Sequence, residues 1–276
     1  SSADATPPLA PNKDTCQAGL YGLQQILQTL PPCAVAFSGG LDSRFLLLML
    51  AKQGKDALAV HVTGPHMREK ESRQAVKWLI EHSLPFTTVP FDPLSIAKVA
   101  ANERDRCYHC KLHMFSAIKA AAPKRLILDG SNASDAREYR PGSQALEALG
   151  VVSPLAEAGL SKPMIQVLAA EQGLDRPSQP GRPCLLTRFP YAFTPTLDLL
   201  KRIEAAEDEV EELGFNDFRL RWLGDLALLQ IAAREEELLE VKRAALLKIL
   251  SKHGFDHADL ETRVNISGFY DYPADS

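Results

Sequence analysis

Short apolar runs alternate with longer amphipathic stretches through the first two thirds of the chain. Apolar runs at residues 33–37 and 57–63 are typical of buried strands, and further strands are predicted at 86–90 and 125–129. Helical spacing of apolar residues fills the intervals between them and also precedes the first run, at residues 17–30. Strands that alternate with helices imply right-handed crossovers and a parallel sheet. We therefore predict an α/β fold, a doubly wound parallel sheet with helices on both faces.

A proline-rich segment at residues 175–183 interrupts this pattern. It holds three prolines and one glycine, which make it too rigid and too poor in backbone donors for a helix or a central strand. We place a linker there. Beyond it the spacing predicts helices at 195–214 and 234–253 and strands at 218–222, 226–231 and 260–266. These elements predict a small C-terminal α+β domain.

Three regions follow from these boundaries. Residues 1–15 are rich in proline and alanine and are expected to be a flexible leader, because no basic segment precedes an apolar one. Residues 16–183 form the first domain and residues 184–276 the second. No apolar run approaches the roughly 20 residues that cross a bilayer. We expect a cytoplasmic protein with no membrane partner.

Composition and charge narrow the possible partners. The chain is 45% hydrophobic and 24% charged, which is average for a globular protein and argues against a disordered or disulfide-scaffold chain. Its 31 basic side chains face 35 acidic ones, a net charge of −4. No general basic field therefore attracts long nucleic acids, and we expect none as a partner.

The segment 38–43, with the sequence Ser-Gly-Gly-Leu-Asp-Ser, follows a buried strand and opens a helix. In that position a glycine turn can direct backbone N–H groups at an anion. The segment lacks the Gly-Lys-Ser/Thr of a Walker A loop and the Gly-x-Gly-x-x-Gly of a dinucleotide site. The alternative is an ordinary strand-to-helix turn with a capping aspartate.

Three of the five cysteines form a candidate site. Cys107 and Cys110 have Cys-x-x-Cys spacing before a helix, and Cys184 follows in the proline-rich region. Three thiolates are one ligand short of a closed zinc site, although His109 could be the fourth ligand. In an iron–sulfur cluster three thiolates would leave one iron open. The alternative is a set of inert thiols.

Several separated motifs together resemble one family. The segment 38–43 resembles the PP-loop of the ATP pyrophosphatase superfamily. With it, the motifs at 129–135, 139–142, 153–160 and 182–191 resemble the LarE family of ATP-dependent sulfur transferases. The last of these, with Pro-Cys-Leu-x-Thr-Arg-x-Pro-Tyr, is the most specific. The resemblance spans residues 20–270 and implies the PP-loop type of parallel sheet.

The resemblance implies an ATP site and a reaction. The ATP-binding residues would be Ser38, Gly39, Gly40, Asp42, Ser43 and Gly130. Asp42 would reach Mg²⁺. The catalytic residues would be Asp42 and Cys184. A carboxylate of a pyridinium biscarboxylate mononucleotide would be adenylated and then attacked by sulfur. The product would be a thiocarboxylate in the synthesis of the nickel-pincer nucleotide, the cofactor of lactate racemase.

The family uses two sources of sulfur. Some members sacrifice one cysteine, which would be Cys184 in this chain. Others hold a [4Fe-4S] cluster on three cysteines, and the resemblance places it on Cys107, Cys110 and Cys184. We expect the cluster, together with ATP and Mg²⁺, to be the cofactors, and we expect the three sulfurs to converge close to the phosphate loop.

Two arginines alternate along the predicted strand at 218–222. Alternation places Arg219 and Arg221 on one face of that strand. The resemblance assigns them to the phosphate of the nucleotide substrate, a role that suits the guanidinium fork. The alternative is a solvated strand face paired with Glu207 or Glu211 of the acidic helix.

Two residues depart from the family pattern. Arg44 stands where the family usually has Ser or Thr, and we expect altered contacts at the start of the helix. Gln230 stands where many members have Glu, which puts a copy of the metal site of single-cysteine members in doubt.

Two other functions remain open. A PP-loop enzyme that thiolates tRNA would also use paired cysteines, although the acidic charge and the lack of a recognisable RNA-binding appendage count against it. A non-catalytic iron–sulfur or nucleotide sensor has the Arg44 departure as its support. We expect a small-molecule nucleotide as the substrate and a homo-oligomer in solution.

Overall fold

The computed structural model describes residues 11–135, 141–181 and 183–271. Most of the predicted leader, together with Tyr139, Arg140 and Arg182 of the family motifs, lies outside these residues. The chain divides into two units, each discontinuous in sequence. The first unit is Ser1–Thr63, Glu71–Pro90 and Lys111–Gln179, and the second is Gly64–Lys70, Phe91–Cys110 and Pro180–Ser276.

The first unit contains a four-stranded parallel sheet, as the sequence predicts. Its strands are β1 (Cys33–Ala36), β2 (Ala57–Thr63), β3 (Phe86–Pro90) and β4 (Leu126–Leu128), in the order β3-β2-β1-β4. The chain leaves β1 toward β2 and β3 on one side and returns to β4 on the other. The carboxyl ends of β1 and β4 therefore flank a topological switch point, where open α/β sheets bind ligands.

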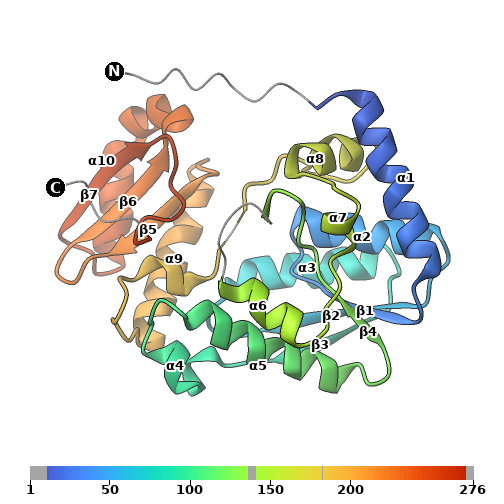
Figure 1. Cartoon of the computed structure of the whole chain (residues 1–276). Helices are drawn as coiled ribbons and strands as arrows, with labels where there is room; N and C mark the ends of the chain where they lie inside the picture. The colour runs from blue at the N-terminus through green and yellow to red at the C-terminus, as the bar shows by residue number, and fades with distance from the viewer. Residues whose placement is uncertain (1–10, 136–140, 182, 272–276) are drawn as a thin grey trace. The chain divides into compact units, whose positions relative to one another are not determined.

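Helices flank this sheet. They are α1 (Lys13–Thr29), α2 (Leu41–Lys52), α3 (Glu69–Glu81), α5 (Arg106–Ala121), α6 (Pro141–Ala148), α7 (Pro154–Glu157) and α8 (Lys162–Glu171). Figure 1 shows α2 and α3 on one side of the strands and α5 on the other. One apolar core joins β1 to α1, α2 and α8, with Leu23, Val35, Phe45 and Ile165 fully buried in it. Burial on both faces explains why β1 and β2 are largely continuous apolar runs, whereas β3, at the edge of the sheet, has no buried residue.

The first helix begins earlier than the sequence predicts. The Asn12 side chain accepts a hydrogen bond from Asp14 N–H and caps α1, which starts at Lys13. Residues 13–15 therefore belong to a helix, and the leader boundary at residue 15 is corrected.

The second unit contains a three-stranded sheet of mixed direction. Its strands are β5 (Phe218–Trp222), β6 (Ala227–Ala232) and β7 (Ala258–Arg263), in the order β5-β6-β7. β5 pairs with β6 antiparallel, and β6 pairs with β7 parallel. The last strand, predicted at 260–266, starts earlier because its ladder with β6 begins at Ala258, opposite Ala227.

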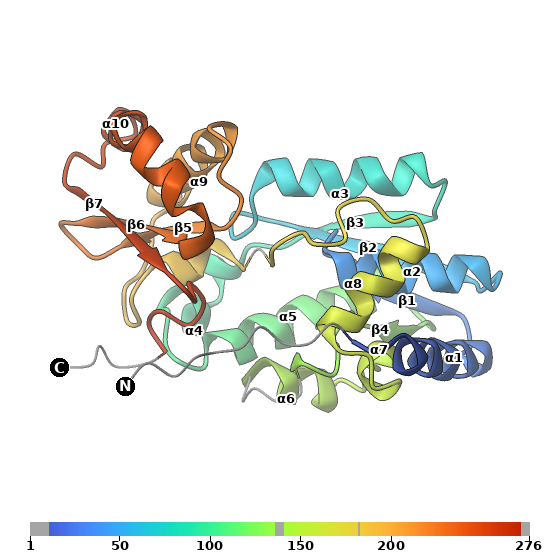
Figure 2. The same cartoon turned by 90° about the horizontal axis from the view of Figure 1, so that it is seen from above.

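Helices cover one face of this second sheet. They are α9 (Leu197–Glu212) and α10 (Glu236–Lys252), and a short helix α4 (Ala97–Ala100) and three 3₁₀ turns, η1 (Pro93–Ser95), η3 (Leu185–Arg188) and η4 (Ala233–Glu235), complete the unit. Figure 2 shows α9 and α10 against the strands. Leu220 and Leu229 face the shared core of strands and helices. Gly254, with φ of +77°, follows the C-cap residue His253 of α10.

The second unit takes in more of the chain than the sequence predicts. Segments 64–70 and 91–110 belong to it, although both precede the predicted linker. Val99 shows the reason, since its buried side chain packs in the same core as α9 and α10. No described helix is long and apolar enough to cross a membrane.

Candidate active site

The loop after β1 depends on its two glycines. Gly39 has φ of +78°, and a Cβ atom there would lie 2.6 Å from the Cβ atom of Ala75. Gly40 is the N-cap residue of α2. A left-handed backbone and a close approach to a neighbouring helix both require a residue without a side chain. The loop therefore presents bare backbone at the start of a helix, where N–H groups attract anions.

Two serine hydroxyls line the same loop. The Ser38 and Ser43 Oγ atoms lie 3.3 Å apart, and Ser43 Oγ donates to the Gly40 carbonyl at 3.1 Å. Gly40 N–H points to Ser38 Oγ at 3.3 Å. The hydroxyl groups of Ser38 and Ser43 are thus gathered at the head of α2.

Gly130 lies beside this loop from the other side of the switch point. A Cβ atom on Gly130 would lie 3.1 Å from the Ser43 nitrogen, closer than most neighbours tolerate. The preceding Asp129 is buried and accepts a hydrogen bond from Ser153 Oγ at 2.6 Å. Gly130 and the loop at 38–43, which follow β4 and β1, therefore lie side by side at one edge of the sheet.

Asp42 is paired with a lysine that the sequence did not single out. The Lys162 ammonium lies 2.9 and 3.1 Å from the two carboxylate oxygens of Asp42, and Asn132 donates to one of them at 3.4 Å. Burial raises the pKa of Asp42, against the opposing effect of Lys162. Lys162 begins α8 directly after the family motif at 153–160, a position that could have marked it.

His61 supports the loop from β2. It is fully buried, its Nδ1 atom lies 2.8 Å from the Phe37 carbonyl, and its Nε2 atom lies 2.7 Å from Ser72 Oγ. Burial lowers the pKa of His61, which favours the neutral form of the ring. An isolated histidine in an apolar strand gave no signal of this contact in the sequence.

Arg44, the first departure from the family pattern, lies away from the loop. Its guanidinium is buried, pairs with Asp175 at 2.6 Å and lies 3.4 Å from the Gln179 side-chain oxygen. Its Cζ atom also lies 5.9 Å from the centre of the Trp78 ring. Arg44 therefore ties α2 to the end of the first unit, and its backbone N–H continues the helix normally toward the Gly40 carbonyl.

The three candidate cysteines all lie in the second unit. Cys107 is exposed and Cys110 half-buried in the first two turns of α5, and Cys184 is the N-cap residue of η3. All five cysteines of the chain lie in its described parts, and none forms a disulfide.

One asparagine holds the two cysteine-bearing segments together. Asn102 Nδ2 donates to the Pro190 carbonyl at 2.7 Å, and Ala192 N–H donates to the Asn102 carbonyl at 3.1 Å. The Arg104 and Arg106 guanidinium groups both lie against the Tyr191 ring, 4.9 and 4.8 Å from its centre. Segments about 90 residues apart thus become neighbours.

The surroundings of Cys184 keep its thiol protonated. Burial raises its pKa to about 11, and the charge of Cys107 adds to this, whereas Leu186 N–H, at 3.4 Å from the sulfur, and the charges of Arg106 and Arg188 oppose it. Cys107 and Cys184 are therefore within electrostatic reach of each other. Within residues 11–135, 141–181 and 183–271, however, no three His, Cys, Asp or Glu side chains are grouped to hold a metal ion.

The two arginines of β5 share a face, but that face is buried. Arg219 donates to the carbonyls of Phe218 and Gly181, each at 2.6 Å. Arg221 donates to Gln230 Oε1 at 2.9 Å and to the Thr187 carbonyl at 2.7 Å. Burial lowers the pKa of Arg221 to about 9. The alternative of a solvated face paired with Glu207 does not hold, and the phosphate role remains a prediction.

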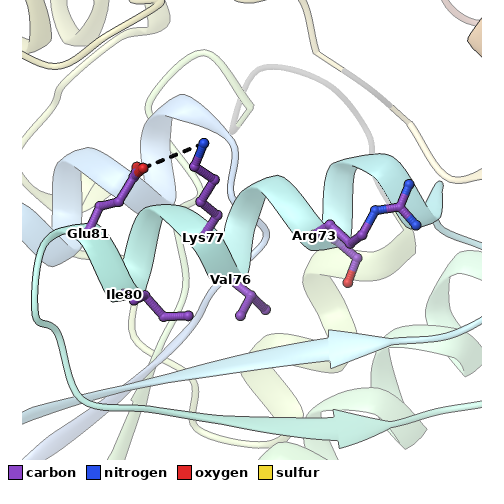
Figure 3. Close-up of a pocket in the computed structure, with 6 residues that line it drawn as sticks. Arg73, Val76, Lys77, Ile80 and Glu81 are labelled. Carbon is purple, nitrogen blue, oxygen red and sulfur yellow. Dashed lines mark ion pairs between the residues drawn. The ribbon is translucent and has the colours of Figure 1, made fainter.

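A surface hollow lies along α3. It has a volume of about 550 Å³ and is lined by α3 residues, among them Val76 and Ile80. Figure 3 shows the Lys77–Glu81 ion pair, 3.6 Å long, beside it. The lining includes none of the predicted site residues.

The parallel sheet and its glycine-serine loop define an α/β protein of Rossmann-like architecture. No protein-family model matches the chain. The chain is 31% identical over 228 residues to the pyridinium-3,5-bisthiocarboxylic acid mononucleotide synthase of Lactiplantibacillus plantarum, with 81% of this chain and 80% of that protein covered. The chain belongs to the family of that synthase, the LarE family.

Two further relatives have no assigned activity. An uncharacterized protein of Synechocystis is 30% identical over 262 residues, which cover 91% of this chain and 96% of that protein. An uncharacterized protein of Methanocaldococcus jannaschii is 28% identical over 226 residues, which cover 80% of this chain and 85% of that protein. The similarity extends over most of the chain in each case.

Proposed function

We propose that this chain is an ATP-dependent sulfurtransferase of nickel-pincer nucleotide biosynthesis. It adenylates a carboxylate of a pyridinium biscarboxylate mononucleotide and converts it to a thiocarboxylate. The observation that carries the proposal is the position of loop 38–43 at the switch point of the parallel sheet. The printed name of the L. plantarum relative supports the choice of product.

The first step activates a poor electrophile. A carboxylate oxygen attacks the α-phosphorus of ATP, the bond to the β-phosphate breaks, and pyrophosphate leaves with the electron pair. The loop supplies hydroxyls and backbone N–H groups for the phosphates through Ser38, Gly39, Gly40 and Ser43, with Gly130 alongside. Asp42 would carry Mg²⁺ on oxygens that now accept from Lys162, so Lys162 must exchange partners.

The second step transfers sulfur. Sulfur held at Cys184 attacks the acyl carbon, the carbon–sulfur bond forms, and AMP leaves with the electrons of the carbon–oxygen bond. If that sulfur is the Cys184 Sγ atom itself, the Cα proton is then removed and the Cβ–Sγ bond breaks with its electron pair on sulfur, which releases the thiocarboxylate and leaves dehydroalanine at position 184. A [4Fe-4S] cluster on Cys107, Cys110 and Cys184 would supply sulfide that is deprotonated at neutral pH. Because the described residues do not assemble a metal site, we derive no step through that group. Sacrifice of Cys184 is the alternative source.

The test of the ATP site is Asp42→Asn. We expect substrate-dependent pyrophosphate release to be abolished while the thermal unfolding midpoint stays close to that of the wild type. Asp56→Asn is a matched control in the same unit, since Asp56 is exposed and pairs only at the surface with Arg125. Unchanged turnover of the Asp42 variant would rule out the assignment.

The source of sulfur is tested separately. Protein purified without oxygen should contain iron and acid-labile sulfide, and Cys107→Ser should lose both if a cluster is the source. If Cys184 is sacrificed instead, mass spectrometry after one turnover should find the Cys184 peptide lighter by one H₂S. Neither result would rule out sulfur transfer itself.

Arg219 and Arg221 are proposed to hold the substrate phosphate. A phosphate there would have to replace carbonyl acceptors such as Gly181 and Thr187. Replacing both arginines with Ala should raise the KM for the nucleotide much more than the KM for ATP. Equal effects on both KM values would indicate a structural role only.

A further inference from the structure

Arg106 is a buried cation with an open hydrogen-bonding edge. It is the first residue of α5 and only 7% exposed. Its Nη1 atom is shielded from solvent and has no hydrogen-bond partner among the described residues. Leaving a buried guanidinium N–H unpaired costs free energy, so such a group in a native protein requires an explanation.

The neighbours of Arg106 hold it in place without neutralising it. Its Cζ atom lies 4.8 Å from the centre of the Tyr191 ring. The nearby carboxylate of Asp271 accepts the Tyr191 hydroxyl, and no ion pair of Arg106 is found in the described part of the chain. The guanidinium is therefore positioned by stacking, and its positive charge is left for another group.

The place of Arg106 suits an anionic substrate. The next residue, Cys107, is exposed, so the head of α5 reaches solvent. Arg106 is also among the charges that act on Cys184, the residue proposed to carry sulfur. The carbon that this sulfur attacks must lie beside Cys184. Before its activation by ATP, that carbon belongs to a carboxylate group of the substrate. A planar carboxylate matches the guanidinium fork.

We propose that Arg106 binds the carboxylate of the nucleotide substrate that lies beside Cys184. The inference rests on the proposed function and adds a substrate-binding residue to it. Arg106 selects a negatively charged group at this position of the pyridine ring, whereas the phosphate of the nucleotide is held elsewhere.

Two commercial probes isolate the carboxylate. Nicotinic acid mononucleotide carries one, and nicotinamide mononucleotide replaces it with a neutral amide while keeping ring, ribose and phosphate. Calorimetry should show the wild-type protein binding the acid roughly 10- to 100-fold more tightly than the amide. Arg106→Gln should abolish this preference and leave the affinity for the amide within about twofold.

Arg104→Gln is the matched control. Arg104 lies 4.9 Å from the centre of the same Tyr191 ring but is exposed, so its loss should leave the preference intact. Arg106→Lys keeps the charge without the fork and should keep part of the preference, which tests the idea even if Arg106→Gln folds poorly.

The outcomes separate this inference from the proposed function. A preference that survives in Arg106→Gln, or that is lost equally in Arg104→Gln, overturns the inference alone. Equal binding of both probes by the wild type does the same. If the wild type binds neither probe, the proposed nucleotide site is contradicted and the inference falls with it.

Discussion

Glu207 and Arg188 form an ion pair with almost no contact with water. Two hydrogen bonds of 2.9 and 2.8 Å join them, and the Glu207 carboxylate also accepts Leu220 N–H at 2.9 Å. Their side chains are 1% and 3% exposed. Removing one partner of such a pair leaves the other charge buried without a counter-charge. The pair also anchors the turn that carries Cys184, because Arg188 donates to the Pro183 carbonyl at 3.0 Å.

Glu207→Gln should therefore destabilise the protein at neutral pH by about 3–5 kcal/mol. Burial opposes ionisation of Glu207, yet Arg188 and the hydrogen bonds overcome it and lower the pKa from 4.5 to about 2. Stability from a lowered pKa is fully present above pH 4.5 and is lost as the pH falls toward 2. Urea unfolding at pH 7 and pH 3 should thus show a smaller difference between wild type and variant at pH 3.

Glu240→Gln is the control for this prediction. Glu240 pairs with Arg243 at 2.7 Å on the surface of α10, where solvent screens the interaction. Its substitution should change stability little at either pH. A Glu207→Gln variant as stable as the wild type at pH 7 would contradict the role of the buried pair.

Lys162→Met should weaken ATP binding by roughly tenfold, the effect of losing one charge-assisted hydrogen bond. The Lys162 ammonium lies at the loop beside Asp42, where it can turn to a phosphate oxygen. The measurement is the apparent KM for ATP in pyrophosphate release. Lys52→Met, which removes an exposed lysine bonded to Gln172, should leave that KM unchanged. A normal KM in Lys162→Met would limit Lys162 to neutralising Asp42.

The local sequence predicted part of the candidate site but not the contacts that involve residues far apart in the chain. The loop at 38–43 was predictable because strand, glycine turn and helix are contiguous and have separate signals in periodicity and composition. Lys162, Asn102 and Arg106 were not, since each acts through a contact with a residue about 90 or more positions away. The burial of Arg219 on β5 was not predictable either. Alternation along a strand shows which residues share a face but not what covers that face.

At the scale of elements, the turn from β1 into α2 is set by how closely α3 approaches it. Gly39→Ala places a Cβ atom 2.6 Å from that of Ala75 and also forces a side chain to φ of +78°. The backbone cost alone is about 1–2 kcal/mol. Overpacking adds typically about 1–3 kcal/mol.

Gly54→Ala separates the two contributions. Gly54 has φ of +65°, but nothing lies within 4 Å of a Cβ atom placed there. Chemical denaturation should therefore show Gly54→Ala losing only the backbone cost and Gly39→Ala losing more. Ala75→Gly should restore part of the loss in Gly39→Ala. Equal losses in the two alanine variants would contradict the close approach of α3.

In the whole molecule, the chain passes repeatedly between its two units. Segments 64–70 and 91–110 interrupt the first unit and belong to the second. Arg68 in the former pairs with Glu211 of α9 at 2.7 Å. Val99 in the latter is buried in a core otherwise made by residues 185–255. Each segment therefore has packing or charge partners that lie beyond residue 179.

A fragment of residues 1–179 should therefore fold poorly although it contains the entire parallel sheet. We expect it to bind a hydrophobic dye and to unfold without a sharp transition, whereas the full chain unfolds cooperatively. Circular dichroism and dye fluorescence during denaturant titration provide the measurement. A soluble fragment with a sharp transition would show that the two segments are dispensable for folding of the sheet.

Because the two units alternate along the sequence, packing partners of the second unit leave the ribosome at widely separated times. Val99 emerges long before α9 and the strands at 218–263 that enclose it. At about 5–20 residues per second, that delay is on the order of 10 s. During this delay, the apolar Val99 side chain and the cationic Arg68 of the nascent chain cannot yet contact α9. Translation speed and holdase chaperones should thus govern the yield of this protein more than they would if each unit were made from one uninterrupted stretch.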